Sequence, residues 1–278
     1  DSGRFMKLLP DKYYKFNDLI NVNNNGDHRI TKYFFKNLPD YLEKKSSKSP
    51  QHFPNFGLYI FNRKKYRLTV RCGPIGQLGK GGHAHNDQLS ITLDIAGAPR
   101  IVDPGTYVYT SFPDLRNRYR STSMHNTLAI SGSEQNSWHS ESKDDLFWMR
   151  NDRARAEAVQ ADDEGFVGRH YGFGTPHERS IAARSEKIYI IDECEISGEK
   201  SVFLHFHPDI EIEIISEKSA IAINGNQKIV INIGSGKLSK DNYNYSPSYG
   251  VKQPAQALIV KFAEPRLEWT IGIEGAKY

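Results

Sequence analysis

The sequence predicts a mainly β protein, a large antiparallel β-sandwich (a super-sandwich) with a short, partly helical N-terminal connector. Three observations predict it. From about residue 53 onward, short apolar segments follow one another closely, Gly, Pro and Asn turns separate them, and no helical periodicity intervenes. Such spacing favours antiparallel strands in packed sheets. With 38% hydrophobic and 12% aromatic residues, the 278-residue chain can bury a sizeable core.

The first 50 residues differ from the rest, because they are polar and rich in Lys and Asn. Residues 30–45 could form one or two helices that end at the Ser-Ser-Lys-Ser-Pro segment. We expect residues 1–50 to be a connector, or the remnant of a preceding domain, and residues 51–278 to form the sandwich. The chain starts at Asp1 without a signal peptide, so we expect a piece of a longer protein.

Several segments carry clear strand signals. Residues 57–62 and 66–72 flank an Arg-Lys-Lys turn and predict a hairpin. Residues 88–95 alternate apolar and polar side chains, which indicates a half-buried strand, and Asn224-Gly-Asn226 predicts a tight hairpin turn. Further strands are expected at residues 100–102, 126–131, 146–149, 154–160, 180–184, 187–194, 202–207, 210–215, 220–223, 228–233, 257–262 and 267–273.

Charge and cysteine content narrow the function classes. The net charge of +4 is mildly basic, which suits an acidic partner better than a basic one but is too small to predict nucleic-acid binding. No apolar run approaches the roughly 20 residues of a membrane-spanning helix, so we expect no membrane insertion. The two cysteines, Cys72 and Cys194, are expected to be buried thiols rather than a disulfide.

A candidate metal site is spread over three segments. A glycine-rich loop leads into His83-Ala-His85, and residues i and i+2 of an extended chain share one face. Asp103 follows an apolar strand, and His125 precedes another. Two imidazoles and one carboxylate from strand ends would make a three-ligand zinc set, whereas calcium would favour more carboxylates. The alternative is ordinary: hydrogen-bonded structural histidines and an aspartate that caps a turn.

Two further features could contact a ligand. Three arginines between residues 116 and 120 could line a groove for carboxylate or sulfate groups, although a solvated loop explains them equally well. Tyr107 and Tyr109 could stack on a sugar ring or could simply pack in the protein. From these features we take Tyr107 and Arg120 as candidate substrate-binding residues.

Two longer runs carry a family resemblance. GGHAHNDQLSITLDIAGAPRIVDPGTYVY and RYRSTSMHNTLAISGSEQ resemble the heparinase II/III-like family of polysaccharide lyases over about residues 54–136. The resemblance implies an enzyme with an N-terminal α/α toroid and a C-terminal antiparallel β-sandwich. It also implies that His85, Asp103 and His125 bind one structural divalent metal, usually zinc. His83 would face the substrate cleft as a catalytic residue.

The resemblance further implies β-elimination of uronic-acid-containing glycans, of the heparan sulfate, heparin or alginate type, in the bacterial periplasm or outside the cell. The family's catalytic Tyr and Asn come from the toroid, and neither can be placed here, so the chain by itself is expected to be inactive. One alternative is a non-catalytic, metal-stabilised carbohydrate-binding sandwich. Another is a cupin-like metal enzyme, but cupins usually add a Glu soon after His-x-His, and residues 86–96 contain none.

Overall fold

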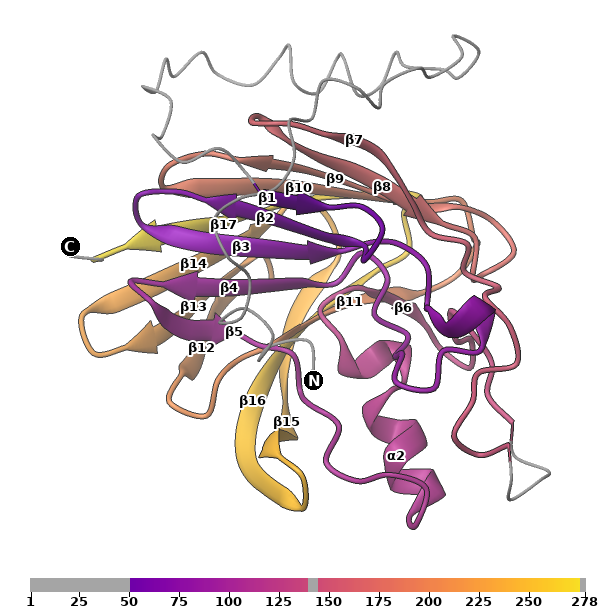
Figure 1. Ribbon diagram of the computed structural model, residues 1–278. Coiled ribbons are helices and arrows are strands. Elements are labelled where there is room, and N and C mark those ends of the chain that lie inside the picture. Colours follow the sequence, from indigo (N-terminus) through magenta and orange to yellow (C-terminus); the bar gives the residue numbers. More distant parts are fainter. Residues whose placement is uncertain (1–50, 140–144, 276–278) are drawn as a thin grey trace, which may run out of the picture. The chain divides into compact units, whose positions relative to one another are not determined.

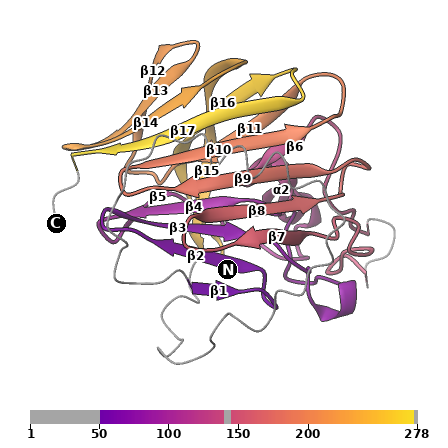
Figure 2. The ribbon, with the colours of Figure 1, turned by 90° about the horizontal axis from the view of Figure 1, so that it is seen from above.

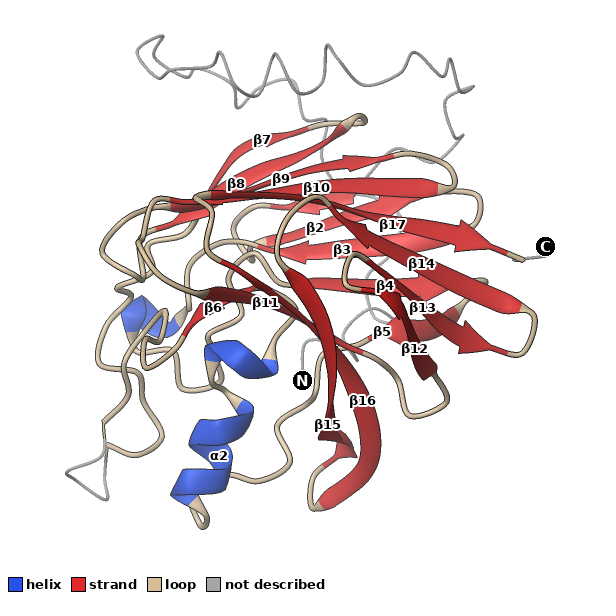
Figure 3. Ribbon diagram, turned by 180° about the vertical axis from the view of Figure 1, so that it is seen from behind, coloured by secondary structure: helices blue, strands red, loops and turns tan. Residues whose placement is uncertain are grey.

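The computed structural model describes residues 51–139 and 145–275, which belong to one compact unit, Glu43–Tyr278. All sheets in this part are antiparallel, and helix is scarce (Figures 1 and 3). The expected connector and its helices lie outside the described residues, so the domain boundary at residue 50 stays a prediction. No helix among the described residues has the length and apolar character needed to cross a membrane.

The strands form three sheets. The first has five strands in the order β1 (Gln51–Phe53), β2 (Leu58–Asn62), β3 (Tyr66–Arg71), β4 (Ile91–Ile95) and β5 (Ala98–Ile101). The second has eight, in the order β12 (Glu211–Ser216), β13 (Ser219–Asn224), β14 (Gln227–Ile233), β17 (Arg266–Glu274), β10 (Lys187–Cys194), β9 (His177–Ala183), β8 (Gly165–His170) and β7 (Glu157–Ala161). The third has the order β15 (Lys237–Ser248), β16 (Val251–Phe262), β11 (Lys200–His205) and β6 (Leu128–Ile130). Between residues 51 and 275, the described segments contain the helix α2 (Pro113–Tyr119) and two short 3-10 turns, η3 (Gln77–Gly79) and η4 (Thr122–Met124).

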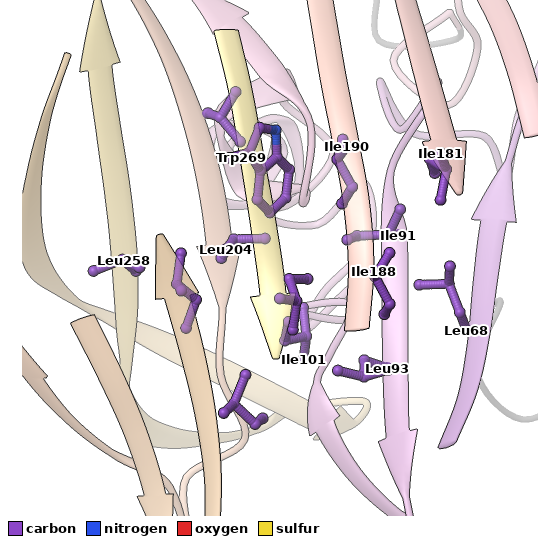
Figure 4. Close-up of a cluster of buried hydrophobic side chains, with 14 of the residues drawn as sticks. Leu68, Ile91, Leu93, Ile101, Ile181, Ile188, Ile190, Leu204, Leu258 and Trp269 are labelled. Carbon is purple, nitrogen blue, oxygen red and sulfur yellow. The ribbon is translucent and has the colours of Figure 1, made fainter. Parts of the chain in front are cut away.

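The core lies between the five-stranded and the eight-stranded sheets, whose buried side chains form one cluster. The two sheets overlap in the view of Figure 2. Leu68 and Leu93 point from the first sheet toward Ile181, Ile190 and Trp269 of the second (Figure 4). All five side chains are essentially inaccessible to solvent. Burying one such aliphatic side chain contributes about 1.5–3 kcal/mol. The predicted antiparallel β-sandwich is therefore confirmed.

The third sheet contributes Leu204 and Leu258 to the same core (Figure 4). Its two long strands, β15 and β16, form a hairpin that lies beside α2 (Figures 1 and 3). The Tyr119 hydroxyl on α2 donates a hydrogen bond to the Asn244 carbonyl on β15 over 3.0 Å. The Ser246 amide donates to the Pro104 carbonyl over 2.8 Å, which fixes the hairpin to the loop after β5. At that point Gly105 has φ +88°, and a Cβ there would overlap the Ser246 carbonyl.

Most local predictions are confirmed. The hairpin β2–β3 forms, and Asn224 pairs with Gln227 across the predicted turn, where Gly225 has φ 55°. Cys72 and Cys194 are free and buried. The strand expected from residue 88 begins only at Ile91, because Leu89 has the left-handed φ of 62°.

Two local predictions are wrong. Residues 146–149 form a turn and an isolated bridge to Trp138 instead of a strand, because Leu146–Trp148 cover the glycine-rich loop rather than joining a sheet. Most of the arginine-rich segment belongs to helix α2, whose first residue is Pro113. Proline suits this first helical position because its fixed φ matches the helix and its missing amide has no intrahelical partner to lose.

Candidate functional site

Three loops at strand ends bring the predicted metal ligands together. His85 lies before β4, Asp103 directly follows β5, and His125 ends η4 just before β6. Their ligand atoms all lie within 4.8 Å of one another. The His85 and His125 rings have centroids 5.1 Å apart. Residues distant in the sequence thus converge in the set that the family resemblance implied.

The donor set of this triad fits a divalent metal. Nδ1 of His125 is hydrogen-bonded to Oδ2 of Asp103 over 3.0 Å. Nε2 of the same ring is buried and has no hydrogen-bond partner among the described residues. A buried ring nitrogen without a partner is costly unless something binds it. Two imidazoles and one carboxylate match a zinc site, and a bound ion would tie the three loops together. Metal binding itself stays a prediction.

The triad's protonation states follow from its burial and mutual contacts. Burial opposes the charge on Asp103, but His125 and its hydrogen bond outweigh burial and hold the pKa of Asp103 well below its usual range. Burial opposes the charge on His125 as well, yet Asp103 raises its pKa. Burial, and then His125, lower the pKa of His85 well below its usual value, so that the His85 ring is neutral at physiological pH.

His83 occupies a different environment from His85. It is exposed, whereas His85 is partly buried. The His83 ring meets Phe147 edge-on, with centroids 5.1 Å apart, and lies 6.2 Å from the Tyr109 ring. The two imidazoles of the His-x-His pair are therefore divided between an exposed position and the triad, which leaves His83 accessible to a ligand.

Arg116 links the residue before His83 to the separate segment that packs on the His83 ring. Its guanidinium donates to the carbonyls of Gly82, Leu146 and Phe147 over 2.7, 2.9 and 3.0 Å. The Phe147 ring also lies so close to Gly82 that a Cβ at this glycine would overlap it. Close packing against Phe147 thus requires a glycine at position 82. The same Phe147 ring contacts His83 and holds its orientation.

The open arginine groove expected from the sequence is wrong for Arg116 and Arg120, because both face inward from α2 and are only 4% and 1% exposed. Nε of Arg120 donates to Oδ1 of Asn117, and its guanidinium lies 4.9 Å from the centroid of the Trp138 ring. Burial lowers the pKa of Arg120 to about 9. A direct substrate contact for Arg120 stays a prediction that this burial does not support.

Tyr107, the second predicted substrate ligand, is half-buried and has φ 62°. Its ring packs on Tyr119 with centroids 5.4 Å apart, and Nζ of Lys252 lies 5.5 Å from its centroid. The structure therefore shows it packed, as the ordinary reading of the sequence expected. Its contact with substrate stays a prediction.

Sequence reasoning missed the residue that links the loops beneath the triad. Asn126, fully buried, donates from Nδ2 to the carbonyls of Ile91 and Val102 over 2.7 and 2.8 Å. Its Oδ1 accepts a hydrogen bond from the His205 amide over 2.7 Å. One amide group thus joins β4, the end of β5 and β11 next to His125. The only signal was an asparagine directly after a candidate ligand.

Comparison with known proteins agrees with this geometry. The family model described as Heparinase II/III-like, C-terminal matches residues 45–274. A heparan sulfate lyase HepC mutant from Pedobacter heparinus aligns with a TM-score of 0.66 and 18% identity, covering 84% of this chain and 38% of that one. A heparinase III structure aligns with a TM-score of 0.66 and 14% identity, covering 83% and 37%. No curated protein sequence matches the chain.

The chain thus spans little more than a third of the length of these solved structures. At such identities the structural likeness shows the fold, whereas the family model covers most of the chain in sequence. By that match, and in agreement with its sandwich fold, the chain belongs to the heparinase II/III-like family, of which it carries the C-terminal domain.

Proposed function

We propose that this domain is part of a polysaccharide lyase that cleaves uronic-acid-containing glycans by β-elimination, of the heparan sulfate, heparin or alginate type. The observation that carries the proposal is the exposed imidazole of His83, held by Phe147 and by the Arg116 bonds, two residues from the triad. A histidine suits proton transfer near neutral pH, because its ordinary pKa lies there.

In the proposed reaction, the base removes the proton from C5, next to the uronate carboxylate. The electron pair of that C–H bond forms the C4–C5 double bond, the C4–O4 bond breaks, and O4 takes up a proton. His83 would act as the base or would neutralise the carboxylate so that C5 becomes acidic enough. The developing negative charge needs hydrogen-bonding or cationic groups around it.

Beneath His83, the residues His85, Asp103 and His125 would hold one structural divalent metal, with zinc as the expected ion. The ion would supply a fixed link among three loops and take no part in proton transfer. Because ligand loops that are tied together hold their neighbours in place, the triad would limit the freedom of the segment that carries His83. The triad would thus help to position His83, whereas it would supply no group for proton transfer.

The remaining catalytic groups would come from elsewhere in the full-length protein. We propose an N-terminal toroid domain that supplies a Tyr and an Asn, and a periplasmic or secreted location in a bacterium. The domain alone would then be inactive. Support for these points comes from the family match and from the fraction of the related chains that this chain covers.

The proposal is tested by incubating the full-length protein with heparan sulfate, heparin, alginate and a neutral glucan, and by following the ultraviolet absorption of the unsaturated product. We expect absorption to rise with at least one uronate polymer and not with the glucan. Binding without any unsaturated product would favour a non-catalytic carbohydrate-binding sandwich instead.

A further inference from the structure

An exposed aromatic side chain marks the tip of the β15–β16 hairpin, the long hairpin beside α2 in Figure 1. Tyr249 is 64% exposed although one of its faces lies on Tyr109, with centroids 5.9 Å apart and planes only 19° from parallel. With that much of the side chain in solvent, the opposite face of the ring is open. An aromatic ring held flat with one free face is suited to stacking.

The hairpin tip is fixed in place by backbone hydrogen bonds. The Gly250 amide donates to the Tyr107 carbonyl over 2.8 Å, one residue after Tyr249. The Ser246 amide donates to the Pro104 carbonyl, also over 2.8 Å. These two bonds attach the hairpin to the loop that begins at Asp103. Tyr249 is therefore attached to the loop that carries Asp103 and Tyr109.

The stacked pair leads directly to the proposed catalytic residue. Tyr109 lies between Tyr249 and His83, since its ring is stacked on the former and meets the latter edge-on at 6.2 Å. Three rings thus run from the hairpin tip to the exposed imidazole. Counted from His83, Tyr249 lies one ring beyond Tyr109, and its free face is the one turned away from Tyr109. A glycan bound at His83 would reach this face only with a neighbouring sugar residue that passes the edge of the stacked pair.

A cation accompanies this aromatic face. Lys252 is exposed, three residues after Tyr249 on the same hairpin, and its Nζ lies 5.5 Å from the centroid of the Tyr107 ring. The corner therefore offers a flat aromatic surface and an exposed lysine three residues apart on one hairpin. A pyranose that carries a carboxylate or sulfate has the matching features, namely an apolar C–H face and a negative group at its edge.

We propose that Tyr249, backed by Tyr109, is a stacking platform for one sugar ring of an acidic glycan, and that Lys252 meets the carboxylate or sulfate of that ring. The inference rests on the proposed function, since it names a second contact for the substrate of His83. The hairpin would contribute to substrate affinity, and proton transfer would remain the role of His83. The other possible occupant of this face, a second domain of the same protein, is an outcome of the test.

The test uses the full-length protein and measures KM and kcat for heparan sulfate and alginate in four variants. Tyr249→Ala should raise KM about tenfold with kcat unchanged, because the platform binds substrate and transition state alike. Tyr249→Phe should stay within about twofold of the wild type, since the ring is kept. Lys252→Gln should raise KM at low salt and less at high salt. Phe56→Ala, on a 58% exposed ring in the turn between β1 and β2, is the control and should change neither parameter.

An unchanged KM in Tyr249→Ala would overturn the platform. If the melting temperature of this variant falls while its KM stays unchanged, the ring serves domain packing. If the wild type yields no unsaturated product, the proposed function fails and the platform is tested separately. Calorimetric titration with heparan sulfate and alginate oligosaccharides then compares the same variants. About tenfold weaker binding by Tyr249→Ala supports the platform, and equal binding overturns it.

Discussion

Arg179 and Asp192 form a fully buried ion pair between β9 and β10, with Nε donating to Oδ1 over 2.7 Å and a terminal nitrogen donating to Oδ2 over 3.1 Å. The same guanidinium donates to the carbonyls of Leu89 and Asn126, each over 2.8 Å. These carbonyls belong to the segments that follow His85 and His125. The pair thus connects the eight-stranded sheet to the segments next to two members of the triad.

Replacing Asp192 should be strongly destabilising. Asp192→Asn leaves the Arg179 charge buried without its partner, which costs about 3–5 kcal/mol in comparable cases. The carboxylate also accepts hydrogen bonds from Nε2 of His177 and Nε1 of Trp269, each over 2.8 Å. Urea denaturation measures the loss. Glu217→Gln, which removes the exposed partner of Lys237, is the matched control and should leave the midpoint unchanged.

Acid should destabilise the fold through His170. Burial, followed by the neighbouring His177 and Arg179, lowers the pKa of His170 well below its usual value. Between that lowered pKa and about 6.5 the unfolded chain binds a proton that the folded chain does not, so stability falls as pH falls. From pH 7.5 to 5.5 this one group should cost on the order of 1 kcal/mol. His170→Gln should reduce the slope of unfolding free energy against pH, and an unchanged slope would refute the assignment.

The loop around His83 should not tolerate a side chain at Gly82. In Gly82→Ala the new Cβ meets the Phe147 ring, which must move and release the edge-on contact with His83. We expect kcat of the full-length protein to fall about tenfold to a hundredfold, because small misplacements of a catalytic group are costly. Gly272→Ala, at a position without a left-handed φ where the new Cβ meets its nearest atom at an ordinary contact distance of 3.7 Å, should retain kcat. Equal activity of both variants would show that Phe147 does not position His83.

Metal removal should lower the melting temperature. A strong chelator removes the stabilisation that a bound ion gives to the folded state, and we expect a shift of several degrees. Asp103→Asn keeps the acceptor that the Gly105 amide uses over 2.9 Å but weakens the ligand set. Its melting temperature should therefore respond to chelator much less than that of the wild type. An identical melt of the wild type with and without chelator would exclude a structural metal.

The sheets and the triad were predictable from the sequence because both depend on local signals. Alternation predicted the strand that ends at Ile95, and the Asn224-Gly-Asn226 turn predicted one hairpin. Candidate ligands at three strand ends indicated a metal site, and the family resemblance narrowed it to the triad. Arg116 and Arg120 were misjudged because a charged, arginine-rich segment has the composition of an exposed loop. Their burial depends on carbonyls of residues 82 and 146–147 and on Trp138, which the sequence does not place nearby.

The buried Arg179–Asp192 pair and the Tyr249–Tyr109 stack were not predictable from the sequence. The stack joins residues that are far apart in the chain. Arg179 and Asp192 are paired directly across the β9–β10 hairpin, so their contact depends on the register of that hairpin, which no periodic pattern fixes. A charged residue within an otherwise apolar strand, as Asp192 is in β10, was the only signal for the first. Tertiary contacts of this kind become visible only when the strand order is known.

If His83 takes part in β-elimination, loss of its imidazole must slow the reaction, and the most direct test is the rate of unsaturated product formation by full-length His83→Ala. We expect kcat to fall about 10²- to 10⁴-fold, as expected for loss of a proton-transfer group, with the melting temperature unchanged because the side chain is exposed. His207→Ala, at a histidine near the end of β11, serves as the control and should retain wild-type kcat. Full turnover by His83→Ala would contradict the account.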